Sequence, residues 1–178
     1  MSNLTPDQAH LIVHNAILGL LKNESRTTRA VLAAVPNANL DYRPDPSAKS
    51  ANELLRHIAS AENWFIKSVI DGAFVPGSVK IPDDVKTPAE VVEWYANEHA
   101  KNFDAVTQMS GEQLAQVMDF RGMFQNQAFT FLQAGLLHTI HHRGQLSTYL
   151  RPMGAKVPAI YGESYDSAQA KKAAQVQP

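Results

Sequence analysis

The sequence predicts an all-α protein that folds as a four-helix bundle. Two observations carry this prediction. Four long segments repeat apolar residues at the helical period, whereas the period-2 alternation of strands is nowhere sustained. The segments are also bounded by residues that begin or end helices. Four long helices in one domain are typical of a bundle.

The first helix is expected to begin after Thr5 and to end before Pro36. Thr5 is followed by a proline and, three residues after the cap, by Gln8, which is the pattern of a capping box. The residue before a proline disfavours the α conformation, so the helix should stop there. Residues 36–50 contain further prolines and several Asn and Asp residues, which favour an irregular linker.

Similar signals place the other three helices. Ser50 and Glu53 form a second capping box, which opens a helix over about residues 50–71. The same pattern recurs at the start of a helix over about 87–110. The fourth helix should run over about 125–151, where a proline follows.

The boundaries of the domain follow from these helices. We expect one domain over residues 1–166. Residues 167–178 are rich in Ala, Gln and Lys, and we expect them to form a disordered tail.

Composition narrows the class of protein. The chain has 178 residues, 44% of them hydrophobic and 19% charged, and a formal net charge of -1, which argues against a nucleic-acid binder. No apolar run approaches the roughly 18 residues of a membrane helix, and the start lacks a signal-peptide pattern. The absence of cysteine excludes disulfides and thiolate ligands. We expect a cytoplasmic protein that acts on a small molecule and binds neither nucleic acid nor a membrane.

The histidines of the fourth helix are the most informative feature. The segment LLHTIHHRGQLSTYL holds His138 and His142 at an i,i+4 spacing, about 40° apart around the helix. Two imidazoles on one helix can reach the same metal ion at this spacing. His141 diverges from His142 by about 100°. His57, on the mostly apolar side of the second helix, is the candidate third ligand.

Three other histidines are given ordinary roles. His10 and His14 are also four residues apart, but an antiparallel pairing of the first two helices places His14 roughly 20 Å from the level of His57. We expect a structural or surface role for this pair. His99 follows Glu98 near the charged side of the third helix, so we expect it to be solvated.

Two polar residues are candidates for a catalytic role. Glu24 lies within the apolar stripe of the first helix near the inferred level of His57, where an isolated carboxylate needs a partner. It could bond a ligand histidine, act as a base, or turn outward at the edge. Gln145 shares the face of His138 and could orient a ligand or a bound water, or simply bond the backbone. Arg143 is expected to pair with a carboxylate or to cap the next segment rather than to contact the metal.

With these residues assembled, the chain resembles the DinB-like, or YfiT-like, family of small four-helix metalloproteins. Three features carry the resemblance: His57 in SANELLRHIASAENWF, the HxxxH and Arg-Gly of HTIHHRGQL, and the segment LRPMGAKVPAIYGESYD after the fourth helix. Together they span about Leu4–Asp166. In the last segment, Tyr161 is expected to fold back over the mouth of the pocket.

The resemblance implies an up-down-down-up bundle with a long connection between the second and third helices. It also implies a divalent metal held by His57, His138 and His142 with water on the open positions. Imidazole ligands suit zinc, nickel, copper and iron alike, and we expect one ion of zinc, nickel or iron per chain. Members of the family often dimerise, and Trp94 and Tyr95 on an otherwise charged helix suit a homodimer. Family members include transferases and isomerases that use low-molecular-weight thiols.

Three imidazoles and an open position are typical of a catalytic rather than a structural metal site. A metal there can lower the pKa of bound water toward about 7, which would give a hydrolase. It can equally favour the thiolate form of a bound thiol, which would give a transferase. The sequence does not choose between these reactions, nor does it exclude a non-catalytic metal-binding protein with a stress-response or partner-binding role.

Overall fold

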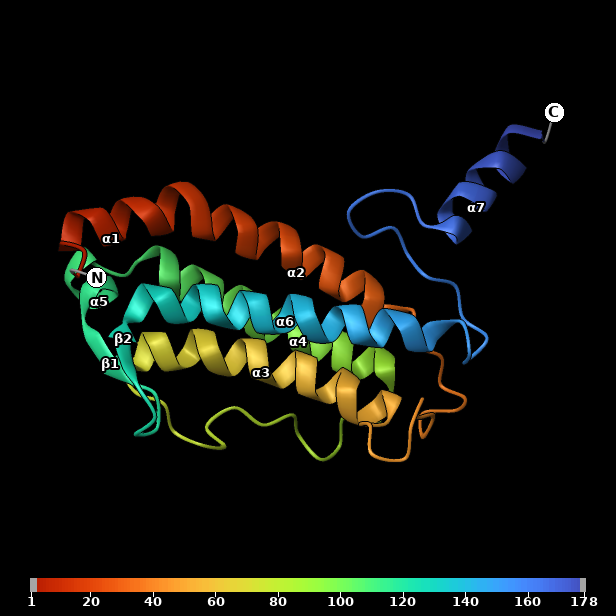
Figure 1. The fold of residues 1–178 in the computed structure, drawn as a ribbon, viewed down its shortest axis with the longest axis horizontal. Helices are drawn as coiled ribbons and strands as arrows, with labels where there is room; N and C mark the ends of the chain where they lie inside the picture. Colours follow the sequence, from red (N-terminus) through yellow and green to blue (C-terminus); the bar gives the residue numbers. More distant parts are fainter. Residues whose placement is uncertain (1–2, 177–178) are drawn as a thin grey trace.

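The structure is a computed structural model that describes residues 3–176, and it shows a bundle of four long helical rods (Figure 1). In chain order, the four rods are α1 (Pro6–Ile12) continued by the π-helical turn η1 (Val13–Ile17) and α2 (Leu18–Ala33), then α3 (Ala51–Asp71), α4 (Pro88–Thr107) and α6 (Ala128–Leu150). The first rod and α6 run in one direction, whereas α3 and α4 run in the other (Figure 1). The predicted all-α, up-down-down-up bundle is therefore confirmed.

The helix starts fall where the sequence places them. The side chains of Thr5, Ser50 and Thr87 each accept a hydrogen bond from the amide three residues later, and the Gln or Glu at that position bonds back to the cap. Gly72 ends α3 with φ 73°, a left-handed conformation that glycine adopts without steric cost. These local signals fix the length of each rod.

The connection between α4 and α6 holds structure that the sequence analysis missed. The predicted third helix ends at Thr107, and Ser110 caps a separate short helix, α5 (Gly111–Ala115). An antiparallel pair of three-residue strands follows, β1 (Val117–Asp119) and β2 (Gln125–Gln127). These strands are too short and too polar to give a period-2 signal, and β2 delays the start of α6.

The chain after the bundle also differs from the prediction. Residues Tyr165–Val176 form a helix, α7, where a disordered tail over 167–178 was expected. Residues 177–178 of that tail lie outside the described residues. The helix projects from the bundle (Figure 1), and Asp166 at its start pairs with Arg151 at 3.2 Å. Its polar sequence forms a helix without contributing to the apolar core.

The interior of the bundle is divided along its length. One apolar cluster lies at the end formed by α1, α5 and the strands, and a second lies at the end where α3 begins. In each rod, the residues between these clusters include buried polar side chains. The buried polar set in this middle layer comprises Glu24, Ser25, Thr28, Glu62, Asn63, His99, Asn102, Thr139 and Arg143.

The long connection between α3 and α4 covers one side of the bundle. Residues 72–87 run along α3 from one end to the other (Figure 1). Side chains of α3 hold this connection in place: Arg56 donates a hydrogen bond to the carbonyl of Val85 at 2.8 Å, and Trp64 donates to that of Val75 at 2.9 Å. None of the helices in the described part of the chain is long and apolar enough to cross a membrane.

Candidate metal centre

Three histidines converge between α3 and α6. His57 comes from α3, and His138 and His142 come from successive turns of α6. One ring nitrogen of each lies within 4.8 Å of the others, and the ring centroids are 4.4 to 5.0 Å apart. Within residues 3–176 this is the one group of histidine and acidic side chains close enough to hold a metal ion. The structure thus brings together the three residues that the sequence analysis selected.

A glycine allows the two helices to approach. Gly135 lies one turn before His138, and a Cβ atom at this position would stand 2.5 Å from the Cβ of Phe65 on α3. No side chain larger than hydrogen fits there without a shift of the helices. Because α3 and α6 are antiparallel, this contact brings His57, early in α3, to the level of the later half of α6.

The protonation state of the histidines suits metal coordination. Burial, followed by the charge of His142, lowers the pKa of His57 to about 4, and burial with the charges of the neighbouring histidines does the same for His138. Both imidazoles are therefore neutral near pH 7, which is the form that binds a metal. The Nδ1 atom of His138 is buried and has no hydrogen-bond partner among the described residues. Three convergent ring nitrogens fit a divalent metal.

Gln145 acts on the third histidine. Its Oε1 atom lies 2.7 Å from Nδ1 of His142, so the Nε2 atom of that ring is left free. The amide nitrogen of Gln145 lies 3.2 Å from His141, whose side chain is exposed and outside the group of three. Gln145 therefore orients a candidate ligand, which is one of the two roles that the sequence left open. Such hydrogen bonds fix the tautomer and the ring orientation of a metal-binding histidine.

Two pockets flank the three histidines. The first, which we call the aromatic pocket, has a volume of about 420 Å³ and includes His57 and His138 in its wall. Its other lining residues include Trp64, Phe65 and Phe120, with Arg121 at the tip of the strand hairpin. Arg121 adopts φ 57°, a conformation that is uncommon outside glycine.

The second pocket, which we call the lysine pocket, lies on the other side of the histidines. Its volume is about 590 Å³, and His142 and Gln145 line it together with Lys49 and Tyr149. Lys49 forms no salt bridge within the described part of the chain. Each of the two pockets beside the three histidines therefore contains one cationic side chain, Arg121 in the aromatic pocket and Lys49 in the lysine pocket.

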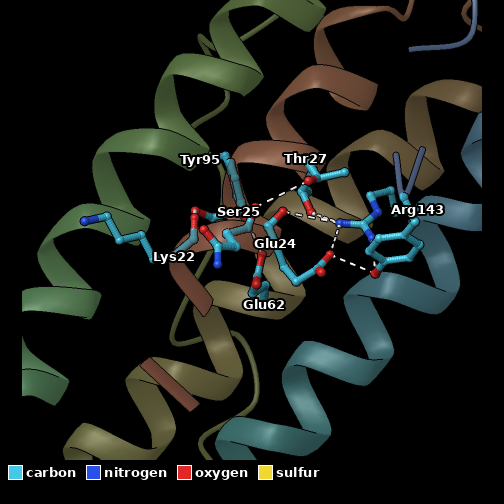
Figure 2. Close-up of polar contacts among 10 residues, drawn as sticks. Lys22, Glu24, Ser25, Thr27, Glu62, Tyr95 and Arg143 are labelled. Carbon is cyan, nitrogen blue, oxygen red and sulfur yellow. Dashed lines mark hydrogen bonds and ion pairs between the residues drawn. The ribbon is translucent and has the colours of Figure 1, made fainter. Parts of the chain in front are cut away.

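Glu24 does not contact the histidines. Its carboxylate forms a 2.6 Å ion pair with Arg143 and accepts a 2.9 Å hydrogen bond from Tyr161. Figure 2 shows Glu24 and Arg143 pointing toward each other from α2 and α6. Arg143 also donates to the Tyr161 hydroxyl at 2.7 Å and to the Thr28 hydroxyl at 3.3 Å. The guanidinium is almost completely buried, with 1% of its side chain exposed.

Of the roles that the sequence left open for Glu24, a bond to a ligand histidine is not the one seen, although the level inferred for Glu24 along the bundle was right. Glu24 and Thr28 lie opposite Arg143, which is the residue after His142. One residue is about 100° of helix rotation, so Arg143 faces α2 while its neighbour faces α3. The prediction that Arg143 pairs with a carboxylate is confirmed. Tyr161 folds back onto this ion pair and lines neither pocket beside the histidines, so its predicted place was wrong.

The sequence analysis missed a second buried carboxyl group. Glu62 is completely buried on α3 and accepts a 2.5 Å hydrogen bond from the hydroxyl of Tyr95 on α4. Burial raises the pKa of Glu62 to about 7, against the opposing effects of the Tyr95 bond and the charge of Arg143. Glu62 lies four residues from Ile58 and from Ile66, on the apolar stripe of α3. The signal that singled out Glu24 was therefore present here as well.

The structure also shows whether the other histidines and Tyr95 lie where the sequence predicted them. His10 and His14 stack on each other, with ring centroids 4.0 Å apart, away from the group of three, as expected of a structural or surface pair. His99 is buried, with 6% of its surface exposed, so its predicted solvated role is wrong. Tyr95 is likewise fully buried, and it offers no surface for a dimer.

Comparison with known proteins agrees with this fold. The model of the DinB family matches residues 7–175. The chain belongs to the DinB family. A relative from Bacillus subtilis (strain 168), the uncharacterized protein YjoA, is 26% identical over 142 residues, which is 79% of this chain and 90% of YjoA.

Solved structures of DinB-like proteins share the fold. The crystal structure of YjoA from Bacillus subtilis has a TM-score of 0.68 at 22% identity and covers 83% of this chain and 99% of its own. A DinB-like protein from Bacillus cereus ATCC 10987 has a TM-score of 0.67, also at 22% identity, and covers 82% of this chain and 95% of its own. At these identities the likeness concerns the fold alone.

Proposed function

We propose that this DinB family protein is a metal-dependent enzyme that transfers a group between a low-molecular-weight thiol and a second small molecule. His57, His138 and His142 would hold one divalent metal, zinc, nickel or iron, and would leave at least one position open for a substrate. The bound metal would favour the thiolate form of the thiol sulfur. The thiol as cosubstrate is carried over from the family resemblance.

The observation that carries this proposal is the position of the histidines between two pockets. A transfer reaction needs two substrates to meet at one centre, and the aromatic and lysine pockets open on opposite sides of it. Lys49 gives the lysine pocket a cation for a carboxylate on the thiol. Trp64, Phe65 and Phe120 give the aromatic pocket an apolar surface for the second substrate.

The transfer would be a nucleophilic substitution by the thiol sulfur. The thiol sulfur attacks an electrophilic carbon of the second substrate, so that a C–S bond forms while the bond to the leaving group breaks. The thiol would release its proton to solvent when it becomes the thiolate, and the leaving group would then depart with the electron pair of the broken bond, so that the net products are the thioether and one equivalent of acid. The chain's own residues position the reactants: Gln145 holds the His142 ring at 2.7 Å, and the aromatic side chains exclude water from the second substrate.

A hydrolase is the second candidate, because the same open position suits a bound water. The two candidates make different demands on cosubstrate. A transferase consumes the thiol and the electrophile in a one-to-one ratio, whereas a hydrolase cleaves its substrate without a thiol. A non-catalytic metal-binding protein would do neither.

The test is a turnover assay on metal-loaded protein. Cysteine or glutathione would be mixed with 1-chloro-2,4-dinitrobenzene, and in parallel a panel of nitrophenyl esters would be supplied without thiol. We expect thiol-dependent arylation that is lost in His57→Ala and retained in His141→Ala. Ester cleavage without thiol would favour the hydrolase, and the absence of both reactions across several thiols and electrophiles would contradict an enzyme of either kind.

We also propose that the protein works as a homodimer. This proposal rests on the family resemblance. The two aromatic residues that suited a dimer surface do not add to it, because Tyr95 is part of the core and Trp94 packs against the cluster at the start of α3. Light scattering over a wide concentration range should give a mass near twice 19.6 kDa. A mass of one chain at every concentration would contradict it.

A further inference from the structure

The strand hairpin brings a cation to the aromatic pocket. Figure 1 shows the hairpin of β1 and β2 at the end of the bundle where the connection after α3 begins. Arg121 lies at the tip of this hairpin, and it lines the same pocket as His57 and His138. Among the described residues that line this pocket, Arg121 is the one whose side chain carries a permanent charge.

The backbone at Arg121 is one that arginine seldom adopts. Arg121 and Gly122 are the central residues of the hairpin turn, with φ 57° and 75°, and the Met123 amide donates to the Phe120 carbonyl at 3.0 Å across it. Positive φ at both central positions is the mark of a type I′ turn, in which Asn-Gly, Asp-Gly and Gly-Gly are the favoured pairs. Gly122 fits this preference, whereas Arg121 does not. A residue that breaks a local rule in this way suggests a function for its side chain.

Neighbouring contacts hold the turn in place. The Asp119 carboxylate accepts a hydrogen bond from the amide of Gly122 at 2.6 Å. Phe120 packs among the rings at this end of the bundle, with its centroid 5.9 Å from that of Phe65. Arg121 is exposed and forms no salt bridge within residues 3–176. Its guanidinium is therefore a cation on a fixed support, without a carboxylate of the chain as its partner.

A row of rings joins the hairpin to the metal centre. The ring of His138 lies 5.7 Å from that of Phe65, and Phe65 stacks on Phe120 with an angle of 8° between the two planes. Arg121 follows Phe120 in the chain, so it lies at the opposite end of this row from His138. The pocket volume of about 420 Å³ is near the lower end of the range of about 300–1,000 Å³ for small-molecule sites. This space suits one flat body that reaches from the histidines to the hairpin.

We propose that Arg121 selects the second substrate of the transfer reaction, and that this substrate is a flat electrophile with a carboxylate at the end remote from its reacting carbon. The carboxylate pairs with the guanidinium at the hairpin, and the reacting carbon lies at the histidine end. Arginine suits this role because its planar guanidinium donates two parallel hydrogen bonds to one carboxylate. A single cation also balances a carboxylate better than a doubly charged phosphate. This assignment rests on the proposed transferase function and adds the chemical class of its second substrate.

Two matched electrophiles test the assignment. 4-Chloro-3,5-dinitrobenzoate carries its carboxylate opposite the reacting carbon, and 4-chloro-3,5-dinitrobenzamide is its neutral counterpart. The readout is the kcat/KM for the benzoate divided by that for the benzamide, measured with glutathione or cysteine on metal-loaded protein. Arg121→Asn should lower this ratio by roughly tenfold, because hydrogen bonds between charged groups are the stronger ones. Lys80→Gln is the control: it removes a cation of the connection that pairs with Asp83 and does not line the pocket, so the ratio should not change.

The asparagine variant separates selection from folding. Asparagine tolerates positive φ and forms with Gly122 a favoured pair for a type I′ turn, so Arg121→Asn should raise the Tm. A fall of the ratio in a more stable protein cannot come from unfolding. Turnover of both electrophiles with an unchanged ratio in Arg121→Asn would overturn the role of Arg121 and leave the transferase function standing.

Direct binding makes the test independent of turnover. Trp64 lines the pocket, and Trp94 is the other tryptophan of the chain, so in a Trp94→Phe background the two nitroaromatic probes report on Trp64 by quenching its fluorescence. The benzoate should bind roughly tenfold more tightly than the benzamide, and Arg121→Asn should abolish this difference. Absence of turnover with every thiol would contradict the transferase, whereas equal binding of the two probes would overturn the role of Arg121.

Discussion

Two neighbouring residues of α6 serve two different polar environments. His142 belongs to a half-exposed group of three histidines, whose pockets are open on both sides. Arg143 belongs to a buried group in which Glu24, Thr28 and Tyr161 all bond its guanidinium. In the first group one ring nitrogen from each of three side chains converges on the others, and in the second the charges are paired and bonded. The difference indicates where the protein has room for a ligand and where it stabilises its own fold.

The largest effect should come from breaking the buried pair. Arg143→Met would leave the Glu24 carboxylate buried without its cation, and removal of one partner from such a pair costs about 3–5 kcal/mol of folding stability. Chemical denaturation would measure this loss. The metal content of the folded fraction should remain that of the wild type, because Arg143 bonds none of the three histidines.

Two variants of Glu24 test whether this residue stabilises the fold without affecting the metal. Glu24→Gln keeps the shape of the side chain, so metal affinity should be unchanged while thermal stability falls. Adding Glu24→Leu to Arg143→Met should restore part of the lost stability, since apolar replacement of a whole buried pair is often neutral. A fall of metal affinity in Glu24→Gln would show that the two polar groups are coupled.

The next effect concerns the helix contact that brings the histidines together. Gly135→Ala would place a methyl group 2.5 Å from the Cβ of Phe65, and such overpacking costs about 1–3 kcal/mol. Because α6 must shift away from α3, metal affinity should fall as well. Gly144→Ala is the control on the same helix: a Cβ there meets nothing within 4 Å, so stability should be unchanged or slightly higher. Denaturation and metal titration of both variants would decide the matter.

A smaller effect should follow from the hydrogen bond to His142. Gln145→Ala removes the group that holds the Nδ1 side of the ring, and loss of such a bond typically lowers metal affinity by about 10- to 100-fold. Competition with a chromogenic chelator would measure it. Affinity equal to that of the wild type would mean that the ring is oriented by packing alone.

The smallest effect is a dependence of stability on pH. In the metal-free protein the pKa values of His57 and His138 are about 4, below the ordinary 6.5 of an unfolded chain. Between these values the unfolded chain binds more protons, so stability should fall as the pH is lowered from about 6.5 toward 4. His57→Asn removes one such group, and its Tm should therefore drop less than that of the wild type between pH 7 and pH 5. The buried Glu62, which shifts stability in the opposite direction, is common to both proteins. A drop as large as that of the wild type would contradict the shift at His57.

The sequence predicted the parts of the fold that local signals specify. Capping residues at Thr5, Ser50 and Thr87 and the apolar period gave the four rods, and the i,i+4 spacing of His138 and His142 gave the shared face. What it missed depends on tertiary contacts. The three-residue strands carry too little pattern to be recognised. No local signal shows that Gly135 stands against a phenylalanine of α3.

The errors at single residues have a common cause. Glu24, Glu62 and His99 all lie on buried stripes at the middle layer, where a polar residue needs a partner from another helix. Sequence periodicity gives the stripe, but the partner depends on rotation about neighbouring helices. A difference of one residue, about 100°, separates a contact with α2 from a contact with α3.

The central claim is that His57, His138 and His142 form a metal centre. The most direct test is the metal-to-protein ratio of the purified chain, measured by mass spectrometry of the elements for the wild type and four single alanine variants. We predict a ratio close to one for the wild type and for His141→Ala. For the alanine variants of His57, His138 and His142 we predict a ratio near zero. Full occupancy in any one of those three variants would contradict the ligand set.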